Sequence, residues 1–295
     1  MPLTHRRVFR VRHYECDAYG HVNHANYLRY MQEAAMDASA TVGYDEARYI
    51  ALGTFWLIRE TDIEYLRPLL YGDQVEVTTW VGDFRRVRSR RFYEMRHTGT
   101  GELVARANTD WVYLDRSSAR PIGVPPEMVE AFAPPGVGDD TRLETMPREH
   151  FPEALPAPPG AFTMHRRVEW RDIDSAQHVN NAAYLNYMEE CGILAAESVG
   201  WTIERMRGEG FAIFARRHQI EYRQQAPRGE ELAITTYLSN VRHTSATRHY
   251  LITRASDGAL ITQARTVWVF VNLETGLPMR VPASFQDDFA ASIAR

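Results

Sequence analysis

An aspartate, a histidine and an asparagine occur together twice in this chain, and they are the residues best suited to chemistry. They are Asp17, His21 and Asn23 in the first copy and Asp174, His178 and Asn180 in the second. A segment with helical periodicity follows each set directly. An ordinary aspartate has a pKa near ~3.9 and is ionised at neutral pH. It can therefore act as a general base or as a nucleophile, and both roles stay open at this point.

The start of a helix supplies the second part of such chemistry. The first N–H groups of a helix have no partner within the helix, and the helix dipole places positive charge there. These groups can stabilise negative charge that develops on a carbonyl oxygen. Loss of one such donor typically lowers the rate by about 10²–10³. An acid just upstream of a helix start would thus stand beside a polarised carbonyl.

Each of these residues also has an ordinary structural explanation. Aspartate before a helix often caps it, and for a single copy we would favour capping at roughly two to one. The duplication reverses those odds. His21 and His178 fit a loop-bracing role and a substrate-orienting role about equally well. For Asn23 and Asn180 we expect side-chain to backbone bonds that hold the loop and influence the rate through geometry.

The whole chain, and not only the motif, is duplicated. The offset of 157 residues that carries Asp17 onto Asp174 also carries Gly43 onto Gly200, without a gap. Two copies are too few for a solenoid, so we expect a pseudo-two-fold pair, the single-chain equivalent of a homodimer. Residues 134–160 contain seven of the fifteen prolines and are predicted to form a stiff linker.

The predicted domains are therefore 1–133 and 161–295, and each copy predicts the same elements. In the first copy, residues 6–14 suit a strand, residues 26–42 a helix, and four strands follow near 55–66, 74–83, 86–97 and 103–114. In the second copy the four strands are expected near 211–223, 231–240, 243–254 and 260–271. Short connections favour antiparallel hairpins, so the fold class is α+β with a sheet wrapped around one long helix. We expect the two copies to pair edge to edge, with sites at the pseudo-dimer interface.

The motif Asp-x-x-Gly-His-Val-Asn-x-Ala-x-Tyr, with a helix and four strands after it, resembles the hotdog-fold acyl thioesterases. The first copy is similar to the 4-hydroxybenzoyl-CoA thioesterase-like branch, including Cys16-Asp17. The second copy, from Glu169 to Asn181, is similar to the catalytic half of the plant acyl-ACP thioesterases, which are also tandem hotdogs. The resemblance implies two tandem hotdog domains and an Asp-dependent thioesterase acting on acyl-CoA or acyl carrier protein.

This chain departs from the plant pattern at two positions. The plant enzymes carry an asparagine two residues after the aspartate and a glutamate near the Glu-Tyr-Arg segment. Ala176 and, by our alignment, Gln225 stand there in this chain. The plant mechanism is therefore not transferred whole, and the part retained in both copies is the Asp, the His and the following Asn.

Tyrosines of the motif and an arginine-rich strand are the candidate substrate-binding groups. They are Tyr27, Tyr184, Arg86, Arg88 and Arg90. Arginine is the better partner for phosphate, and every one of the 34 basic residues is arginine. A solvated sheet face is the more common explanation of such a strand. We place binding of coenzyme A phosphates or of an acidic carrier protein at roughly one in three.

Composition and net charge limit the possible binding partners and the cellular compartment of this protein. A net charge of −4 argues against general nucleic-acid binding. No apolar run approaches the ~18–20 residues that span a bilayer, and the N-terminus lacks a signal-peptide core. With only Cys16 and Cys191 present, we expect a cytoplasmic protein without membrane insertion. No cofactor is expected, and no metal, because nothing completes a site around His21 and His24. A homo-oligomer of the double chain is compatible with the sequence.

Two other functions are compatible with a hotdog fold, which hosts several activities. The first is a dehydratase or hydratase of acyl thioesters, which would pair a histidine with an acid across the site. Those relatives carry a His-Phe-Pro or an Asp-x-Asn-x-x-His pattern, and we expect neither in this chain, which ranks this function second. The second is a non-catalytic acyl-thioester-binding protein. Acyl length, the choice between CoA and carrier protein, and the number of active sites are left open.

Overall fold

The computed structural model describes residues 3–133, 151–152 and 155–294 of the chain. The chain divides into two compact units, Met1–Glu149 and His150–Arg295. Each unit is described by itself. Most of the predicted proline-rich linker lies outside the described residues.

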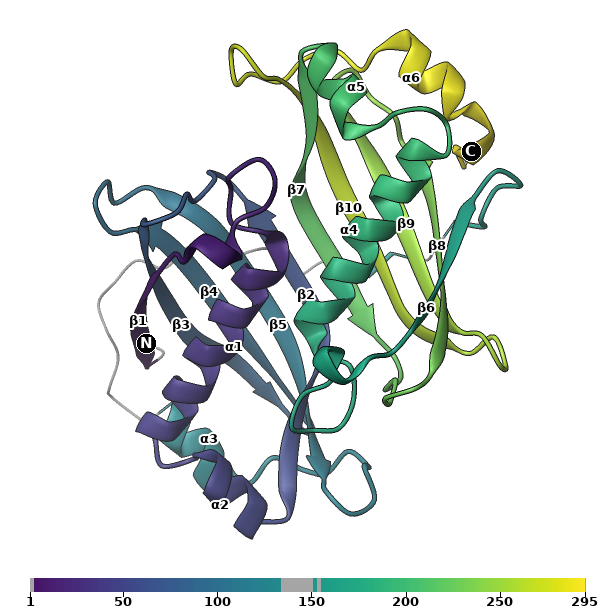
Figure 1. The fold of residues 1–295 in the computed structure, drawn as a ribbon. Helices are drawn as coiled ribbons and strands as arrows, with labels where there is room; N and C mark the ends of the chain where they lie inside the picture. Colours follow the sequence, from purple (N-terminus) through teal and green to yellow (C-terminus); the bar gives the residue numbers. More distant parts are fainter. Residues whose placement is uncertain (1–2, 134–150, 153–154, 295) are drawn as a thin grey trace. The chain divides into compact units, whose positions relative to one another are not determined.

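The first unit places one long helix against a five-stranded antiparallel sheet (Figure 1). The strands follow the order β1-β3-β4-β5-β2. Its elements are β1 (Thr4–Arg10), the 3₁₀ turn η1 (His13–Glu15), α1 (His24–Thr41), α2 (Glu46–Ala51), β2 (Thr54–Tyr65), β3 (Gln74–Arg85), β4 (Arg88–His97), β5 (Leu103–Asp115) and α3 (Pro126–Phe132).

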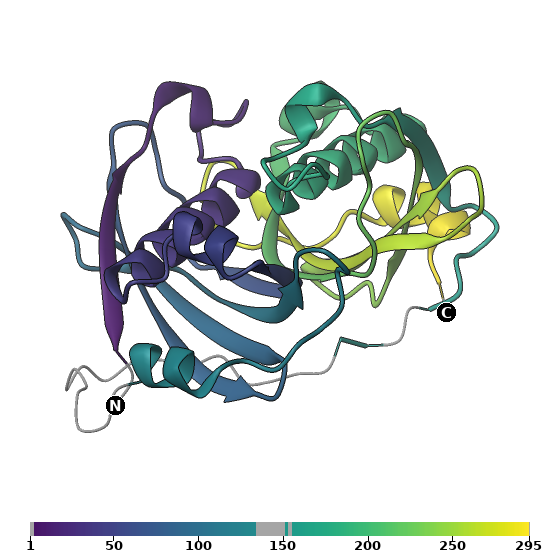
Figure 2. The ribbon, with the colours of Figure 1, turned by 90° about the horizontal axis from the view of Figure 1, so that it is seen from below.

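The second unit repeats this arrangement, with the strand order β7-β10-β9-β8-β6. Its elements are β6 (Phe162–Arg167), η2 (Trp170–Asp172), α4 (Asn181–Glu197), α5 (Ile203–Gly208), β7 (Phe211–Tyr222), β8 (Glu231–Ser239), β9 (Ser245–Arg254), β10 (Leu260–Asn272), α6 (Ala283–Asp288) and η3 (Ala290–Ser292). Figure 2 shows the sheet of each unit curving around its own long helix. This is the α+β arrangement predicted from the repeat.

The strand predicted over residues 6–14 is wrong in its second half. β1 ends at Arg10, and η1 follows at His13–Glu15. The chain turns because the Glu15 carboxylate accepts a hydrogen bond from the backbone N–H of Arg12 (2.7 Å). The short helices α2, α3, α5 and α6 were not predicted either. Six or seven residues are too few to show a helical period in the sequence.

Glycine ends both long helices, as predicted. Gly43 has φ +81° and Gly200 has φ +80°, a left-handed conformation that glycine adopts without steric cost. The N–H of Gly43 donates to the carbonyl of Ala40 (2.9 Å), and that of Tyr44 donates to the carbonyl of Ser39 (2.9 Å). These bonds satisfy carbonyls that the helix end would otherwise leave unpaired.

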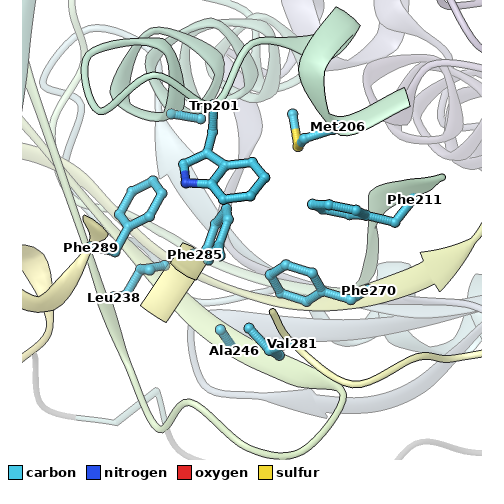
Figure 3. Close-up of a cluster of buried hydrophobic side chains, with 10 residues drawn as sticks. Trp201, Met206, Phe211, Leu238, Ala246, Phe270, Val281, Phe285 and Phe289 are labelled. Carbon is cyan, nitrogen blue, oxygen red and sulfur yellow. The ribbon is translucent and has the colours of Figure 1, made fainter. Parts of the chain in front are cut away.

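Small residues let each long helix lie close to its sheet. In α4, a methyl group built at Gly192 would lie 2.9 Å from the hydroxyl oxygen of Tyr250 on β9. Beyond the end of α4, a cluster of buried aromatic side chains fills the space between helices and sheet (Figure 3). It includes Trp201, Phe211, Phe270 and Phe285. The motif loop lies before the start of α4, and this core packs beyond its end.

Candidate active site

A tight loop holds the first aspartate just before α1. The N–H of Asp17 donates to the carbonyl of His21 (2.7 Å), and the N–H of Gly20 donates to the carbonyl of Asp17 (3.0 Å). The carboxylate is half-buried, and its Oδ1 accepts from the N–H groups of Tyr19 (2.8 Å) and His21 (3.1 Å). Within the described parts of the chain, Oδ2 has no hydrogen-bond partner. The loop therefore orients one oxygen and leaves the other available.

The second aspartate is held differently. Oδ1 of Asp174 accepts from the N–H of Ala176 (2.9 Å), and Oδ2 accepts from the side-chain amide of Asn180 (3.0 Å). Asp174 is also half-buried. Both of its oxygens accept hydrogen bonds. The two loops therefore have the same backbone hydrogen bonds, but the Asp174 carboxylate is more constrained than that of Asp17. Ala176 supplies only its backbone, where the plant family has an asparagine side chain.

Asn23 and Asn180 cap the two helices. The side-chain oxygen of Asn23 accepts from the N–H of Ala25 (3.0 Å), and that of Asn180 accepts from the N–H of Ala182 (2.9 Å). Such a cap stabilises a helix by about 1 kcal/mol. In the second unit the same amide also binds Asp174, so Asn180 ties the carboxylate directly to the helix start.

The first turn of α4 leaves one N–H group available. The N–H of Asn180 donates to the carbonyl of Asp172 (2.8 Å), and the N–H of Ala183 donates to the carbonyl of Asn180 (2.9 Å). The N–H of Ala182 binds the capping side chain. Among the described residues, the N–H of Asn181 has no acceptor. It is the natural donor for an oxyanion at this helix start, and the sequence did not single it out.

The backbone of each motif histidine pairs with the segment that follows the first long strand of its unit. His21 forms an isolated β-bridge with Leu70, in the segment after β2, and His178 forms the equivalent bridge with Pro227. The His178 ring is 8% exposed, and its Nδ1 lies 3.2 Å from the carbonyl oxygen of Val179. If Nδ1 donates there, Nε2 carries a lone pair. That enclosed nitrogen has no partner among the described residues, so it can accept a hydrogen bond from a bound group.

His24 stands at the start of α1, where the second copy has Asn181. Its ring packs against Tyr65 with 5.0 Å between ring centroids. Burial lowers its pKa to about 4, with the charge of Asp17 opposing this shift and the nearby His21 adding to it. The imidazole is thus neutral at pH 7. Throughout the described residues, no group of three or more His, Cys, Asp or Glu side chains is placed to hold a metal ion.

The two motif tyrosines lie in the core. Tyr27 and Tyr184 are each 3% exposed, and burial raises the pKa of both hydroxyl groups. Tyr27 packs edge-on against Tyr65 (5.1 Å between centroids), and Tyr184 packs against Tyr222 (5.7 Å). Both tyrosines therefore pack in the core of their unit. Direct contact between these tyrosines and the substrate stays a prediction.

The three arginines predicted to bind substrate do not form one group. Arg86 and Arg88 are exposed, at the turn between β3 and β4 and at the start of β4. Arg90 is 6% exposed, donates to Oδ1 of Asn108 (2.7 Å) and lies 3.6 Å from the Asp110 carboxylate. Its charge is paired inside the protein, so only the other two are open to an external phosphate or carboxylate.

A pair of buried acids supports the loops, and sequence reasoning missed them. Oε2 of Glu15 accepts from the Tyr30 hydroxyl (2.7 Å), and its backbone carbonyl accepts from the N–H of Asn23 (2.9 Å). Asp172 occupies the equivalent place and holds Asn180 in the same way. The signal was available, because the 157-residue offset carries one acid onto the other.

The dehydratase pattern His-Phe-Pro is present in the chain after all, as His150-Phe151-Pro152. It falls in the proline-rich segment and not in either motif, and His150 lies outside the described residues.

Comparison with known proteins assigns the chain to a family. The model of the Thioesterase-like superfamily matches twice, over residues 11–132 and 168–290. The chain belongs to this superfamily, and the double match confirms the tandem repeat.

Two relatives found by sequence similarity are also named as hydrolases of acyl carrier protein thioesters. A chloroplastic acyl-[acyl-carrier-protein] hydrolase of Cuphea viscosissima is 25% identical over 275 residues, covering 90% of this chain and 63% of that protein. A chloroplastic palmitoyl-acyl carrier protein thioesterase of Arabidopsis thaliana is 24% identical over 287 residues, covering 90% and 64%. This chain thus spans a little under two thirds of their length.

The 12:0-ACP thioesterase from Umbellularia californica superposes with a TM-score of 0.68 at 22% identity, covering 90% of this chain and 93% of that one. An acyl-ACP thioesterase from Bacteroides thetaiotaomicron gives 0.68 at 14% identity, covering 90% and 97%. The expected tandem hotdog fold is confirmed. In the part of the chain that the structure describes, no helix is long and apolar enough to cross a membrane.

Proposed function

We propose that this chain hydrolyses acyl thioesters, with Asp17 and Asp174 as the catalytic carboxylates. The observation that carries the proposal is the duplicated loop, which fixes a half-buried aspartate beside the capped start of a long helix. Membership of the thioesterase-like superfamily and the acyl-ACP hydrolases among the relatives support the reaction type. The acyl group is carried by coenzyme A or by an acyl carrier protein.

In the second unit, the thioester carbonyl oxygen would accept from the N–H of Asn181, the first-turn donor that has no acceptor among the described residues. Negative charge on that oxygen in the transition state is then stabilised by the N–H and by the positive end of the α4 dipole. Asp174 either takes a proton from the attacking water or attacks the carbonyl itself, forming an anhydride that water cleaves. The thiolate leaves in both cases and takes up a proton.

We propose that the two sites hydrolyse thioesters at different rates. Asp17 keeps one oxygen without a hydrogen-bond partner among the described residues, and its lone pairs can be directed at water or carbon. Asp174 must share Oδ2 with the amide of Asn180. We therefore propose Asp17 as the more reactive carboxylate, with Asp174 acting at a slower second site.

Exposed arginines near the turn between β3 and β4 fit the carrier. Arg86 and Arg88 are exposed to solvent, which suits the phosphates of coenzyme A or the acidic surface of a carrier protein. We further propose a reducing, cytoplasmic compartment, supported by the two free thiols of Cys16 and Cys191.

The test is thiol release from a panel of acyl-CoA and acyl-carrier-protein substrates, run with Asp17→Asn and Asp174→Asn. Each substitution should remove the turnover of its own site, with the larger loss from Asp17→Asn. Asp45→Asn is the matched control, because Asp45 caps α2 by accepting from the N–H of Arg48 (2.8 Å) and belongs to neither motif. Absorbance change on enoyl-CoA, without thiol release, would instead indicate a hydratase.

A further inference from the structure

Each unit buries, at the same position of its sheet, an arginine that forms no ion pair among the described residues. These are Arg91 on β4 and Arg248 on β9, related by the repeat and exposed by 6% and 7%. The side chain of Arg248 lies against α4, since a methyl group built at Gly192 would come within 3.8 Å of its Cδ. Neither arginine belongs to the motif loops.

These two guanidinium groups have almost no polar partners. Nη1 of Arg91 donates to the Thr79 hydroxyl at 3.3 Å, and Nη1 of Arg248 donates to the equivalent Thr236 hydroxyl at 3.4 Å. Neither has a carboxylate within ion-pair distance among the described residues. Arg90, the neighbour of Arg91 in the chain, shows the contrast, because its charge is met by Asp110.

The surroundings supply rings and neutral groups instead of an anion. Arg91 lies over the ring of Phe132 (5.6 Å to the centroid), and Arg248 lies over the ring of Phe289 (5.5 Å). Phe289 belongs to the aromatic cluster of Figure 3. The titratable groups that face the two arginines are His5, Tyr49 and Tyr93 in the first unit and Cys191 and Tyr250 in the second.

An arrangement of this kind is unfavourable unless something completes it. A guanidinium carries five N–H donors, and each of these two uses one in the described structure. Burial lowers the pKa of both arginines, which reflects the cost of keeping the charge away from water. Buried charges in proteins are normally paired or bound to a ligand. A buried arginine without an ion pair among the described residues nevertheless occupies this position in both copies.

The position along the helix relates the arginine to the proposed reaction. Gly192 lies eleven residues beyond Asn181, which at 1.5 Å per residue is roughly 16 Å from the start of α4. A thioester bound at the helix start, with its acyl group running along the helix, would bring the distal end of that group to the guanidinium. This step rests on the proposed thioesterase function.

We propose that Arg91 and Arg248 bind a carboxylate at the distal end of the acyl group. The substrates would then be thioesters of dicarboxylic acids, with one carboxyl group joined to the thiol and the other free. A planar guanidinium group can donate two parallel hydrogen bonds to one carboxylate. An acyl group that ends in a hydroxyl or a methyl group cannot accept such a pair of bonds. Thr79 and Thr236 hold the guanidinium from the other side.

The first experiment compares pairs of acyl-CoA substrates of equal chain length, one ending in a methyl group and one in a carboxylate. We expect kcat/KM to be at least tenfold higher for the carboxylate-ended partner at the best chain length. Arg91→Met together with Arg248→Met should abolish this preference, and Arg→Lys at both positions should restore part of it. Arg120→Met and Arg242→Met, which remove exposed arginines, should leave the preference unchanged.

A binding measurement separates this inference from the proposed activity. Calorimetric titration of the intact chain with free dicarboxylic acids should give binding that the corresponding monocarboxylic acids lack, whether or not any thioester is hydrolysed. Equal treatment of both substrate classes by the unmodified protein would overturn the proposal, even if the methionine variants failed to fold. So would methionine variants that are more stable yet keep the preference, because the arginines would then be purely structural.

Discussion

The most informative single residue is Asn180, because it performs two functions that substitutions can separate. Its side-chain oxygen caps α4 through Ala182, and its amide donates to the carboxylate of Asp174. Replacement by serine keeps a capping oxygen but removes the amide donor. Replacement by alanine removes both. The two variants therefore predict different combinations of stability and turnover.

The expected changes in stability and in turnover follow from the two hydrogen bonds of the Asn180 side chain. Loss of a cap costs about 1 kcal/mol, so Asn180→Ala should lower the unfolding temperature by roughly 4 °C for a unit of this size. A hydrogen bond to a charged group contributes about 1.5–3 kcal/mol, and the half-buried setting of Asp174 argues for the lower end. At 1.4 kcal/mol per tenfold, misplacement of this carboxylate should slow the second site by about tenfold, a loss that outweighs the gain from releasing Oδ2.

The assay is thiol release in an Asp17→Asn background, so that only the second site contributes, together with thermal unfolding followed by circular dichroism. Asn180→Ser should keep the unfolding temperature and lose about tenfold in turnover. Asn180→Ala should lose both. Full turnover in Asn180→Ser would refute the idea that the amide positions the carboxylate, and unchanged stability in Asn180→Ala would refute the capping role.

Two further predictions concern pH and packing. Burial lowers the pKa of His24 to about 4 from an unfolded value of 6.5, so the unfolded chain binds the extra proton first; stability should be complete above pH 6.5 and fall as the pH drops toward 4, and His24→Asn should reduce this slope in an unfolding titration. Burial lowers the pKa of His249 to about 4, so this residue contributes to the same pH dependence of stability. The control is that the contribution of His249 remains in the His24→Asn variant. Gly192→Ala would place a methyl group 2.9 Å from the Tyr250 hydroxyl oxygen, so it should destabilise the second unit by about 1–3 kcal/mol in denaturant unfolding. Tyr250→Phe should recover part of that loss, and an unaltered midpoint in Gly192→Ala would contradict the close approach of helix and sheet.

The fold was readable from the sequence because the repeat doubled every signal. Periodicity located α1 and the four strands after it, and a glycine at the same place in both copies marked where each long helix ends. The second half of the strand predicted over 6–14 failed, because the Glu15 carboxylate closes a turn that no alternation of side chains reveals. Short helices such as α2 failed for a related reason, since one or two turns carry too little pattern.

The site was readable in its residue types but not in its geometry. The sequence indicated two equivalent aspartates, whereas the structure gives Asp174 an amide partner on Oδ2 and gives Asp17 none among the described residues. The arginine-rich strand suggested one basic surface, but alternation and register bury Arg90 against Asp110. Arg91 and Arg248 are a similar case. Their residue type is visible in the sequence, but only the fold shows that they are buried without an ion pair among the described residues.

The central claim is that carboxylates beside two helix starts perform the chemistry, and thiol release by the double variant Asp17→Asn with Asp174→Asn tests it most directly. We predict that this variant folds with an unchanged circular dichroism spectrum and releases thiol no faster than buffer, while Asp45→Asn keeps full activity. A correctly folded double variant that still hydrolyses its thioester would show that neither aspartate is catalytic.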